Sequence, residues 1–181
     1  GLDVHEVINI ANQHPRVNVL HPGPGVGGHC ISVDPWFLVS DFPDESQLIK
    51  KARDINDNMP SYVFNKLNEI MSENNIKDYS KVAIYGIAYK ENVDDTRESP
   101  TIQLLNNLDE DSRDKIKIYD PMIQKKMYKS QVEDLQDFID DIKLLVVMVD
   151  HREILESEKI LENKIILDTK NVIKSLPTYK L

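Results

Sequence analysis

The sequence predicts an α/β fold in which a helical segment is followed by a parallel sheet. From residue 81 onward, short apolar runs typical of buried strands alternate with stretches of helical periodicity. Such alternation is characteristic of parallel strands joined by right-handed helical crossovers. Before residue 74 the apolar residues recur at helical spacing, apart from one loop rich in glycine and proline. We therefore divide the chain into a helical part, residues 1–75, and a sheet domain, residues 76–181.

The first part is predicted to hold three helices. Asp3 can cap the first, and Pro15 ends it because the residue before a proline avoids the helical region. Pro35 suits the first turn of a second, short helix. A third helix begins near Asp44 and resumes after Pro60, which we expect to kink it. Its buried side is predicted to consist of Leu48, Ala52, Ile55 and Met59.

The sheet domain is predicted to have four strands, at residues 81–89, 115–119, 144–149 and 165–167. Helices are expected between them, the first opened by Ser99 and Pro100. In parallel sheets of this kind, ligands bind beyond the carboxyl ends of the strands. The residues that this rule gathers at one edge are Tyr89, Lys90, Asp120, Asp150, His151, Thr169 and Lys170.

Composition and charge exclude several classes of protein. The 181 residues are 40% hydrophobic and 29% charged, which is ordinary for a globular protein with a core. A net charge of -9 argues against nucleic acid or an anionic membrane surface as the general partner. The single cysteine excludes a disulfide framework within the chain, and no apolar run is long enough to span a bilayer. We expect a cytoplasmic protein and, because the chain enters a helix directly without an initiator methionine, a piece of a longer one.

The loop rich in glycine and proline is the most informative stretch of the sequence. It reads HPGPGVGGHCISVDPW over residues 21–36 and contains the single cysteine, Cys30. If a helical turn begins at Cys30, the carboxylate of Asp34 lies on the same face, since positions four apart are neighbours. A nearby imidazole such as His29, or amides at a helix start, would favour the thiolate. Two interpretations stay open, a small buried hydrophobic residue and a catalytic thiol.

Two other interpretations of this loop are weaker. Residues 23–28 match the GxGxxG pattern of dinucleotide-binding loops, but a proline precedes the first glycine and a second lies inside the stretch. We therefore do not assign these residues to a dinucleotide. A metal site at His29 and Cys30 would need further ligands at suitable spacing, and the sequence offers no second cluster.

Charged residues elsewhere also allow two interpretations. The loop after the first strand carries Lys90 and Arg97, which can neutralise a phosphate at the sheet edge, and Lys170 can act in the same way. The alternative is a solvated loop with internal ion pairs, each of which contributes little to stability. His14 and Arg16 likewise fit a solvated loop when taken alone.

The chain resembles the UDP-sugar 6-dehydrogenases, of the UDP-glucose/GDP-mannose dehydrogenase family, in the segments HPGPGVGGHCISVDPWFLV, YGIAYKENVDDTRESP and ILDTKNV. The resemblance implies an N-terminal NAD-binding domain, a central helical domain that mediates dimerisation, and a C-terminal Rossmann-like UDP-binding domain. This chain is similar only to the end of the central domain and to the C-terminal domain. Alone, it is therefore expected to be inactive.

The resemblance also implies a reaction. Oxidation of the sugar C6 alcohol with NAD gives an aldehyde, to which Cys30 adds. A second oxidation gives a thioester, which water hydrolyses to the uronate. Asp34 would assist that water or hold the surroundings of the thiol.

Binding roles follow from the same resemblance. Tyr89 and Lys90 match a pair that contacts the UDP-sugar, and Gly27 matches a glycine at which the backbone approaches the sugar. Lys170 stands where many members have an arginine, and it is expected to contact the substrate.

Three further positions concern partners of this chain. His14 and Arg16 match a segment whose arginine reaches the substrate of the neighbouring subunit. Arg97 matches an arginine that meets NAD. The implied partners are thus a UDP-sugar and a second copy of the protein, with NAD bound mainly by a domain that this chain lacks.

Overall fold

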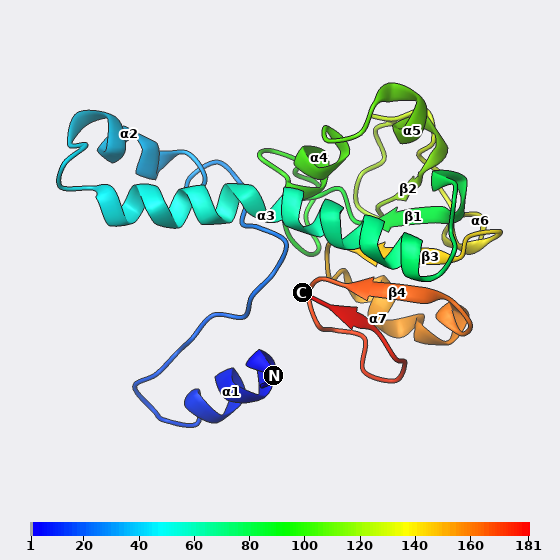
Figure 1. Ribbon diagram of the computed structural model, residues 1–181, viewed down its shortest axis with the longest axis horizontal. Helices are drawn as coiled ribbons and strands as arrows, with labels where there is room; N and C mark the ends of the chain where they lie inside the picture. Colours follow the sequence, from blue (N-terminus) through cyan, green and yellow to red (C-terminus); the bar gives the residue numbers. More distant parts are fainter. Residues whose placement is uncertain (1) are drawn as a thin grey trace.

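A computed structural model describes residues 2–181 and shows a sheet domain from which one long helix projects (Figure 1). The second half of this helix, α3 (Gln47–Glu73), packs on the sheet domain, and its first half extends beyond it beside α2 (Asp34–Asp41). A third helix, α1 (Val4–Ala11), lies near the C-terminus at the end of an extended segment, with Nζ of Lys180 3.6 Å from Oδ2 of Asp3. No helix within residues 2–181 is both long and apolar enough to cross a membrane.

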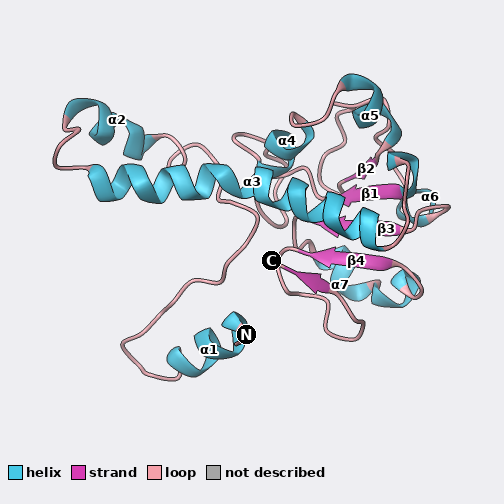
Figure 2. Cartoon of the chain, viewed as in Figure 1, coloured by secondary structure: helices cyan, strands magenta, loops and turns pink. Residues whose placement is uncertain are grey.

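Five parallel strands form the sheet in the order β2-β1-β3-β4-β5 (Figure 2). The predicted parallel α/β sheet is therefore confirmed. The first strand ends earlier than predicted, because Gly86 turns the chain with a φ of +93°. The fifth strand was not predicted, since two residues are too few to form a pattern. The strands are β1 (Val82–Tyr85), β2 (Lys117–Tyr119), β3 (Leu144–Val147), β4 (Ile165–Asp168) and β5 (Tyr179–Lys180).

Helices cover both faces of the sheet. Val82 and Ile84 belong to a core cluster that includes side chains of α3 and α4, whereas Ala83 and Tyr85 belong to a second cluster with side chains of α6 and α7. Successive strand residues point to opposite faces, so the sheet is the middle layer of three. The remaining elements are α4 (Pro100–Leu105), α5 (Glu110–Lys115), α6 (Leu135–Ile139) and α7 (Arg152–Glu156), with short 3-10 turns η1 (Tyr79–Lys81) and η2 (Glu158–Leu161).

The long helix departs from prediction in what its first half buries. α3 runs through Pro60 as one element of 27 residues. The predicted buried side is wrong for this chain: Leu48 and Ile55 are 83% and 56% exposed, Ala52 is exposed and Met59 is half-buried. The first half lies beyond the sheet domain, and periodicity shows which residues share a helix face but not what covers that face.

Candidate active site

Cys30 begins the turn that leads into α2. Its carbonyl oxygen accepts hydrogen bonds from the amides of Val33, at 3.1 Å, and Asp34, at 2.8 Å. The predicted helical turn is therefore present, with Cys30 and Asp34 four positions apart on it. Cys30 is exposed, so the interpretation as a small buried hydrophobic residue is wrong.

The imidazole of His29 lies beside this thiol. Its Nδ1 atom is 3.2 Å from Sγ of Cys30. When that nitrogen carries no proton, it can accept the thiol proton and leave a thiolate, the nucleophilic form of cysteine. The thiol therefore has a potential proton acceptor within hydrogen-bond distance.

The loop that carries Cys30, residues 21–33 (the cysteine loop), is docked on the sheet domain. The amide of Gly28 donates a hydrogen bond to the carbonyl of Arg97 at 2.9 Å. A Cβ atom at Gly28 would lie 2.9 Å from the ring of Tyr89, and one at Gly27 would overlap the carbonyl of Glu98. Only glycine allows backbone and side chain to approach so closely. Contacts within the chain thus require both glycines, and a role for Gly27 at the sugar stays a prediction.

α3 holds the same loop from its other side. Oδ1 of Asn56 accepts a hydrogen bond from the amide of Val26 at 2.8 Å, and its Nδ2 donates to the carbonyl of Val26 at 3.3 Å. The two bonds fix the backbone four residues before Cys30. Sequence reasoning missed Asn56, because a polar residue within a helix gives no signal of a distant backbone partner.

The cysteine loop occupies the ligand-binding edge of the sheet. In this strand order the topological switch point lies between β1 and β3, and ligands of open parallel sheets bind there. The loop residues Pro24 and Gly25 line a small depression at this place. The sheet-edge residues that line it with them are Ala88, Tyr89, Lys90, Met148, Val149 and Lys170.

Arg97 is held by a carboxylate of its own loop. Its Nε atom is 3.0 Å from both oxygens of Asp95, and Nη2 is 2.6 Å from Oδ2. These hydrogen bonds lower the pKa of Asp95 to about 2. The side chain of Arg97 is nevertheless 62% exposed, so the cation stays accessible. The internal ion pair allowed by the sequence is present, and it leaves room for an anionic ligand.

Two lysines flank the depression. Nζ of Lys90, which is exposed, lies 5.6 Å from the centroid of the Tyr89 ring. Nζ of Lys170 lies 3.3 Å from Oδ1 of Asp150, which balances part of its charge. The structure therefore brings Tyr89, Lys90 and Lys170 together at one edge, as the sequence predicts.

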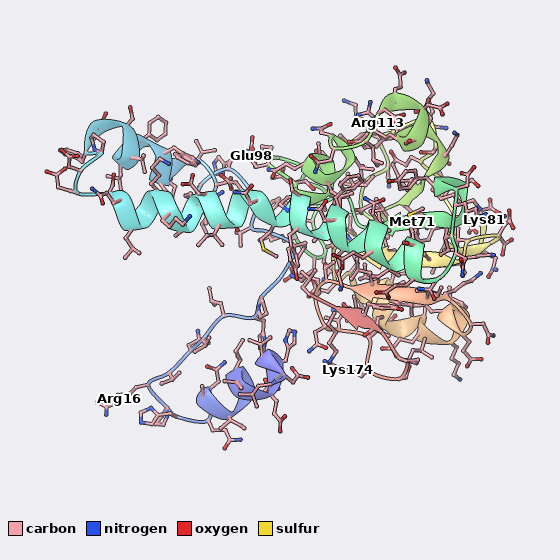
Figure 3. All side chains as sticks on the ribbon, in the orientation of Figure 1. Arg16, Met71, Lys81, Glu98, Arg113 and Lys174 are labelled. Atoms are coloured by element: carbon pink, nitrogen blue, oxygen red, sulfur yellow. The ribbon has the colours of Figure 1, made fainter. Side chains whose placement is uncertain are left out.

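His14 and Arg16 do not join this group within one chain. Both are exposed in the turn that follows α1, before the extended segment that leads to the cysteine loop. Figure 3 shows Arg16 standing away from the sheet domain and from Glu98, which neighbours Arg97. That placement is compatible with a side chain directed at another subunit, and the predicted role stays a prediction.

The resemblance implies NAD as cofactor, but the described residues offer only a cation for one of its anionic groups and no dinucleotide-binding loop. No strand precedes residues 23–28, and the space beside Gly27 and Gly28 is filled by the chain itself. These residues therefore lack the features of a dinucleotide loop. Arg97, an exposed cation whose backbone carbonyl binds the cysteine loop, fits an anionic group of a cofactor. Within residues 2–181, no three His, Cys, Asp or Glu side chains are grouped as metal ligands.

The fold and the site define a Rossmann-like domain that presents an exposed thiol at its ligand-binding edge. Sequence comparison gives the family: the profile of the "UDP-glucose/GDP-mannose dehydrogenase family, UDP binding domain" matches residues 83–175, and that of the family's central domain matches residues 1–58. The chain belongs to this family. Its curated relatives are dehydrogenases, so the family is one of oxidoreductases.

Three relatives indicate which branch of the family is similar. The UDP-N-acetyl-D-mannosamine dehydrogenase of Methanocaldococcus jannaschii is 42% identical over 181 residues, covering 96% of this chain and 40% of that protein. The structure of the corresponding enzyme from Pyrococcus horikoshii superposes with a TM-score of 0.85 at 34% identity, covering 99% of this chain and 44% of the other. That from Staphylococcus aureus superposes with a TM-score of 0.80 at 36% identity, covering 98% and 43%. The chain thus spans well under half the length of these relatives.

Proposed function

We propose that this chain is the C-terminal part of an NAD-dependent UDP-sugar 6-dehydrogenase. Its substrate is UDP-N-acetyl-D-mannosamine and its product UDP-N-acetyl-D-mannosaminuronate. The observation that carries the proposal is the exposed Cys30 thiol, with His29 Nδ1 at 3.2 Å, mounted on the edge of a UDP-binding domain. Residues 1–75 form the end of the central domain and residues 76–181 the UDP-sugar domain. We propose a cytoplasmic location for the protein.

Cys30 carries the chemistry at the sugar C6 carbon. NAD, which would be held mainly outside this chain and met here by Arg97, would accept one hydride in each of two oxidations, so that two NAD molecules are consumed. The Cys30 thiolate adds to the aldehyde carbon and forms a thiohemiacetal. After the second oxidation Cys30 holds a thioester, and attack by water releases the carboxylate and restores the thiol. Asp34, on the turn that begins at Cys30, orients that water or keeps the thiol environment polar.

The UDP-sugar is held by cations at the sheet edge. Lys90 and Lys170 flank the depression beside the cysteine loop, and lysine ammonium groups neutralise phosphate as point charges. Tyr89 packs on the glycines of that loop, so substrate and nucleophile are positioned by one contact. Gly27 would let the backbone of the cysteine loop approach the sugar. Arg16 and His14 complete the site from the neighbouring subunit.

The assignment of the sugar rests on the named relatives. Two alternatives keep the same reaction but act on another UDP-sugar. UDP-N-acetylglucosamine differs from the proposed substrate in configuration at C2, and UDP-glucose carries a hydroxyl there, a difference that no contact among residues 2–181 distinguishes. Assay of the longer protein against the three UDP-sugars decides between them. We expect acid formation with UDP-N-acetyl-D-mannosamine, and a higher kcat/KM for either of the others would overturn the assignment.

Calorimetry on the 181-residue chain tests the binding half of the proposal. We expect UDP to bind and NAD to bind weakly or not at all, because the cations that face UDP lie within this chain whereas the dinucleotide site does not. Tight binding of NAD, or no binding of UDP, contradicts the proposal.

A non-catalytic UDP-sugar-binding and dimerisation module is the alternative from another class. It predicts the same calorimetry. It differs in that the longer protein would form no acid from any of the three UDP-sugars.

An uncovered stripe on α3 supports a homodimer. The residues are Leu48, Ala52, Ile55, Met59 and Tyr62, spaced alternately by four and three, and Leu48, Ile55 and Tyr62 are 83%, 56% and 52% exposed. This is the spacing of a helix seam that packs against another helix. We take the partner to be a second copy, because a two-fold axis lets one stripe cover itself.

The substitution Ile55→Glu is expected to dissociate this dimer. Loss of one buried aliphatic side chain contributes about 2 kcal/mol, and the two-fold axis doubles it, so the dimer weakens by at least about 10²-fold. Sedimentation equilibrium of the longer protein measures the change. Asn65→Glu, which adds the same charge at an exposed position outside the stripe, serves as the matched control. Equal effects of the two variants contradict an interface at the stripe.

A further inference from the structure

A buried carboxylate fixes the backbone immediately before Tyr89 and Lys90. Asp120, which follows β2, is 5% exposed. Its Oδ2 atom accepts the amides of Ile87 at 2.6 Å and Ala88 at 2.8 Å. Its Oδ1 atom accepts two amides of its own turn. Although burial would raise the pKa of Asp120, the hydrogen bonds from His151 and from backbone amides hold it below its ordinary value. Asp120 is therefore an anion that anchors the end of β1.

A buried histidine fixes the backbone just after Lys90. His151, which follows β3, is 1% exposed. Its Nδ1 atom accepts the amide of Asn92 at 3.0 Å, so the proton of the neutral ring resides on Nε2. That Nε2 lies 3.2 Å from Oδ2 of Asp120 and donates to it. The carbonyl oxygen of the Asn92 side chain accepts the amide of Arg152 at 3.3 Å, which closes the connection.

The loop between these two anchors carries the substrate-binding cation. Tyr89, Lys90 and Glu91 lie between Ala88, held by Asp120, and Asn92, held by His151. Asn92 has a φ of +55°, a conformation that a non-glycine residue adopts only when its surroundings hold it there. Among residues 2–181, His151 does not line the depression at the cysteine loop, and it makes no hydrogen bond to Cys30.

We infer that His151 is a positioning residue for Lys90: as a neutral imidazole hydrogen-bonded to both Asp120 and the amide of Asn92, it holds the Lys90 loop in the form that binds the UDP-sugar. The inference rests on the proposed function for the role of Lys90. A second proton on Nδ1 turns the acceptor into a donor facing the Asn92 amide, so protonation of His151 releases the loop and weakens binding of the nucleotide.

Other charged and titratable groups surround this imidazole. The ring of Tyr85, from β1, lies 5.8 Å from it in an edge-on arrangement. The carboxylate of Glu153 accepts the hydroxyl of Tyr85 at 3.4 Å and that of Tyr119 at 3.0 Å. On the other side, Asp150 is paired with Lys170. Asp120 alone among these groups hydrogen-bonds the ring.

Two substitutions of His151 distinguish a role in positioning the Lys90 loop from a general role in packing. Gln carries an amide whose nitrogen and oxygen can replace Nε2 and Nδ1, and it stays neutral at every pH, so His151→Gln keeps both bonds. His151→Leu fills the space and keeps neither. We expect His151→Gln to bind UDP within about twofold of the unsubstituted chain near pH 7.5, and His151→Leu to bind about tenfold more weakly.

The pH dependence of UDP affinity provides a second test, because a purely structural role of His151 would not change it. As the solution is acidified from about pH 7.5, UDP affinity of the unsubstituted chain is expected to fall by about threefold or more relative to His151→Gln. Comparison at each pH cancels the titration of UDP itself. His5→Gln, at a histidine on α1, is the control and is expected to keep the pH dependence.

Amide hydrogen exchange tests the anchor without any ligand. In His151→Leu the amide of Asn92 should lose protection while those of Ile87 and Ala88, held by Asp120, keep it. The inference is overturned if Asn92 stays protected in this variant, or if His151→Gln shows the same acid weakening as the unsubstituted chain. If the unsubstituted chain does not bind UDP at any pH, the proposed function fails, and the exchange of Asn92 still decides whether His151 holds the loop.

Discussion

Replacement of Cys30 by serine in the longer protein of which we propose this chain to be a part should abolish acid formation. A serine hydroxyl beside His29 cannot ionise as a thiol does, so neither the thiohemiacetal nor the thioester forms. By analogy with the loss of other covalent nucleophiles, we expect the rate of uronate formation to fall by at least about 10⁴-fold. Chromatographic quantification of the uronate formed from UDP-N-acetyl-D-mannosamine measures this rate, because NADH also arises from the first oxidation, which does not need the thiol.

The affinity for UDP provides the control for this variant. Cys30 is exposed and its carbonyl, not its sulfur, holds the turn into α2. Cys30→Ser should therefore leave the fold and the Kd of UDP within about twofold. Peptide mass spectrometry of the quenched unsubstituted enzyme should locate the covalent sugar adduct on the peptide that contains Cys30, the single cysteine of these 181 residues. Undiminished uronate formation by Cys30→Ser would refute the proposed chemistry.

Replacement of Gly86 by alanine should cause the largest loss of stability among single methyl additions in the sheet domain. Gly86 has a φ of +93°, and a Cβ atom there would lie 2.5 Å from Cβ of Val149. Strained backbone costs about 1–3 kcal/mol, and overpacking in a core costs about the same again. We expect the free energy of unfolding to fall by about 2–5 kcal/mol, which the midpoint of urea denaturation of the 181-residue chain reports.

Gly23→Ala is the matched control. The nearest atom to a Cβ at Gly23 is Cδ of Lys170 at 3.7 Å, an ordinary contact. The same methyl group should therefore change the free energy of unfolding by less than about 0.5 kcal/mol. Similar midpoints for the two variants would show that the β1–β3 contact at Gly86 can relax.

The sheet was predictable because its strands are continuous apolar runs between helical stretches. Val82–Tyr85 and Leu144–Val147 are buried throughout, as the pattern requires. α5 was missed, because Glu110–Lys115 carries only charged and polar residues and shows no apolar periodicity. The exposed stripe on α3 was misassigned to the core, since a sequence pattern does not distinguish a face covered by the same chain from one covered by another.

Recognition of the site depended on residues close together in sequence. His29, Cys30 and Asp34 stand within six residues, and their relation could be predicted from the spacing. Asn56 and His151 act through backbone amides of Val26 and Asn92, 30 and 59 positions away. Such bonds depend on the packed fold, and no local spacing predicts them. His151 was expected at the sheet edge, but its partners there were not.

The unbroken α3 has a mechanical consequence. At 1.5 Å per residue its 27 residues make a rod about 40 Å long. One end is embedded in the sheet domain through Val63, Leu67 and Ile70, and Asn56 near the middle grips the cysteine loop. A second copy bound to the far end of α3 would then lie at a fixed distance from Sγ of Cys30. The same helix would then position both the dimer interface and the Cys30 thiol. A substitution that changes the packing angle between the two subunits should therefore also displace the thiol from the substrate.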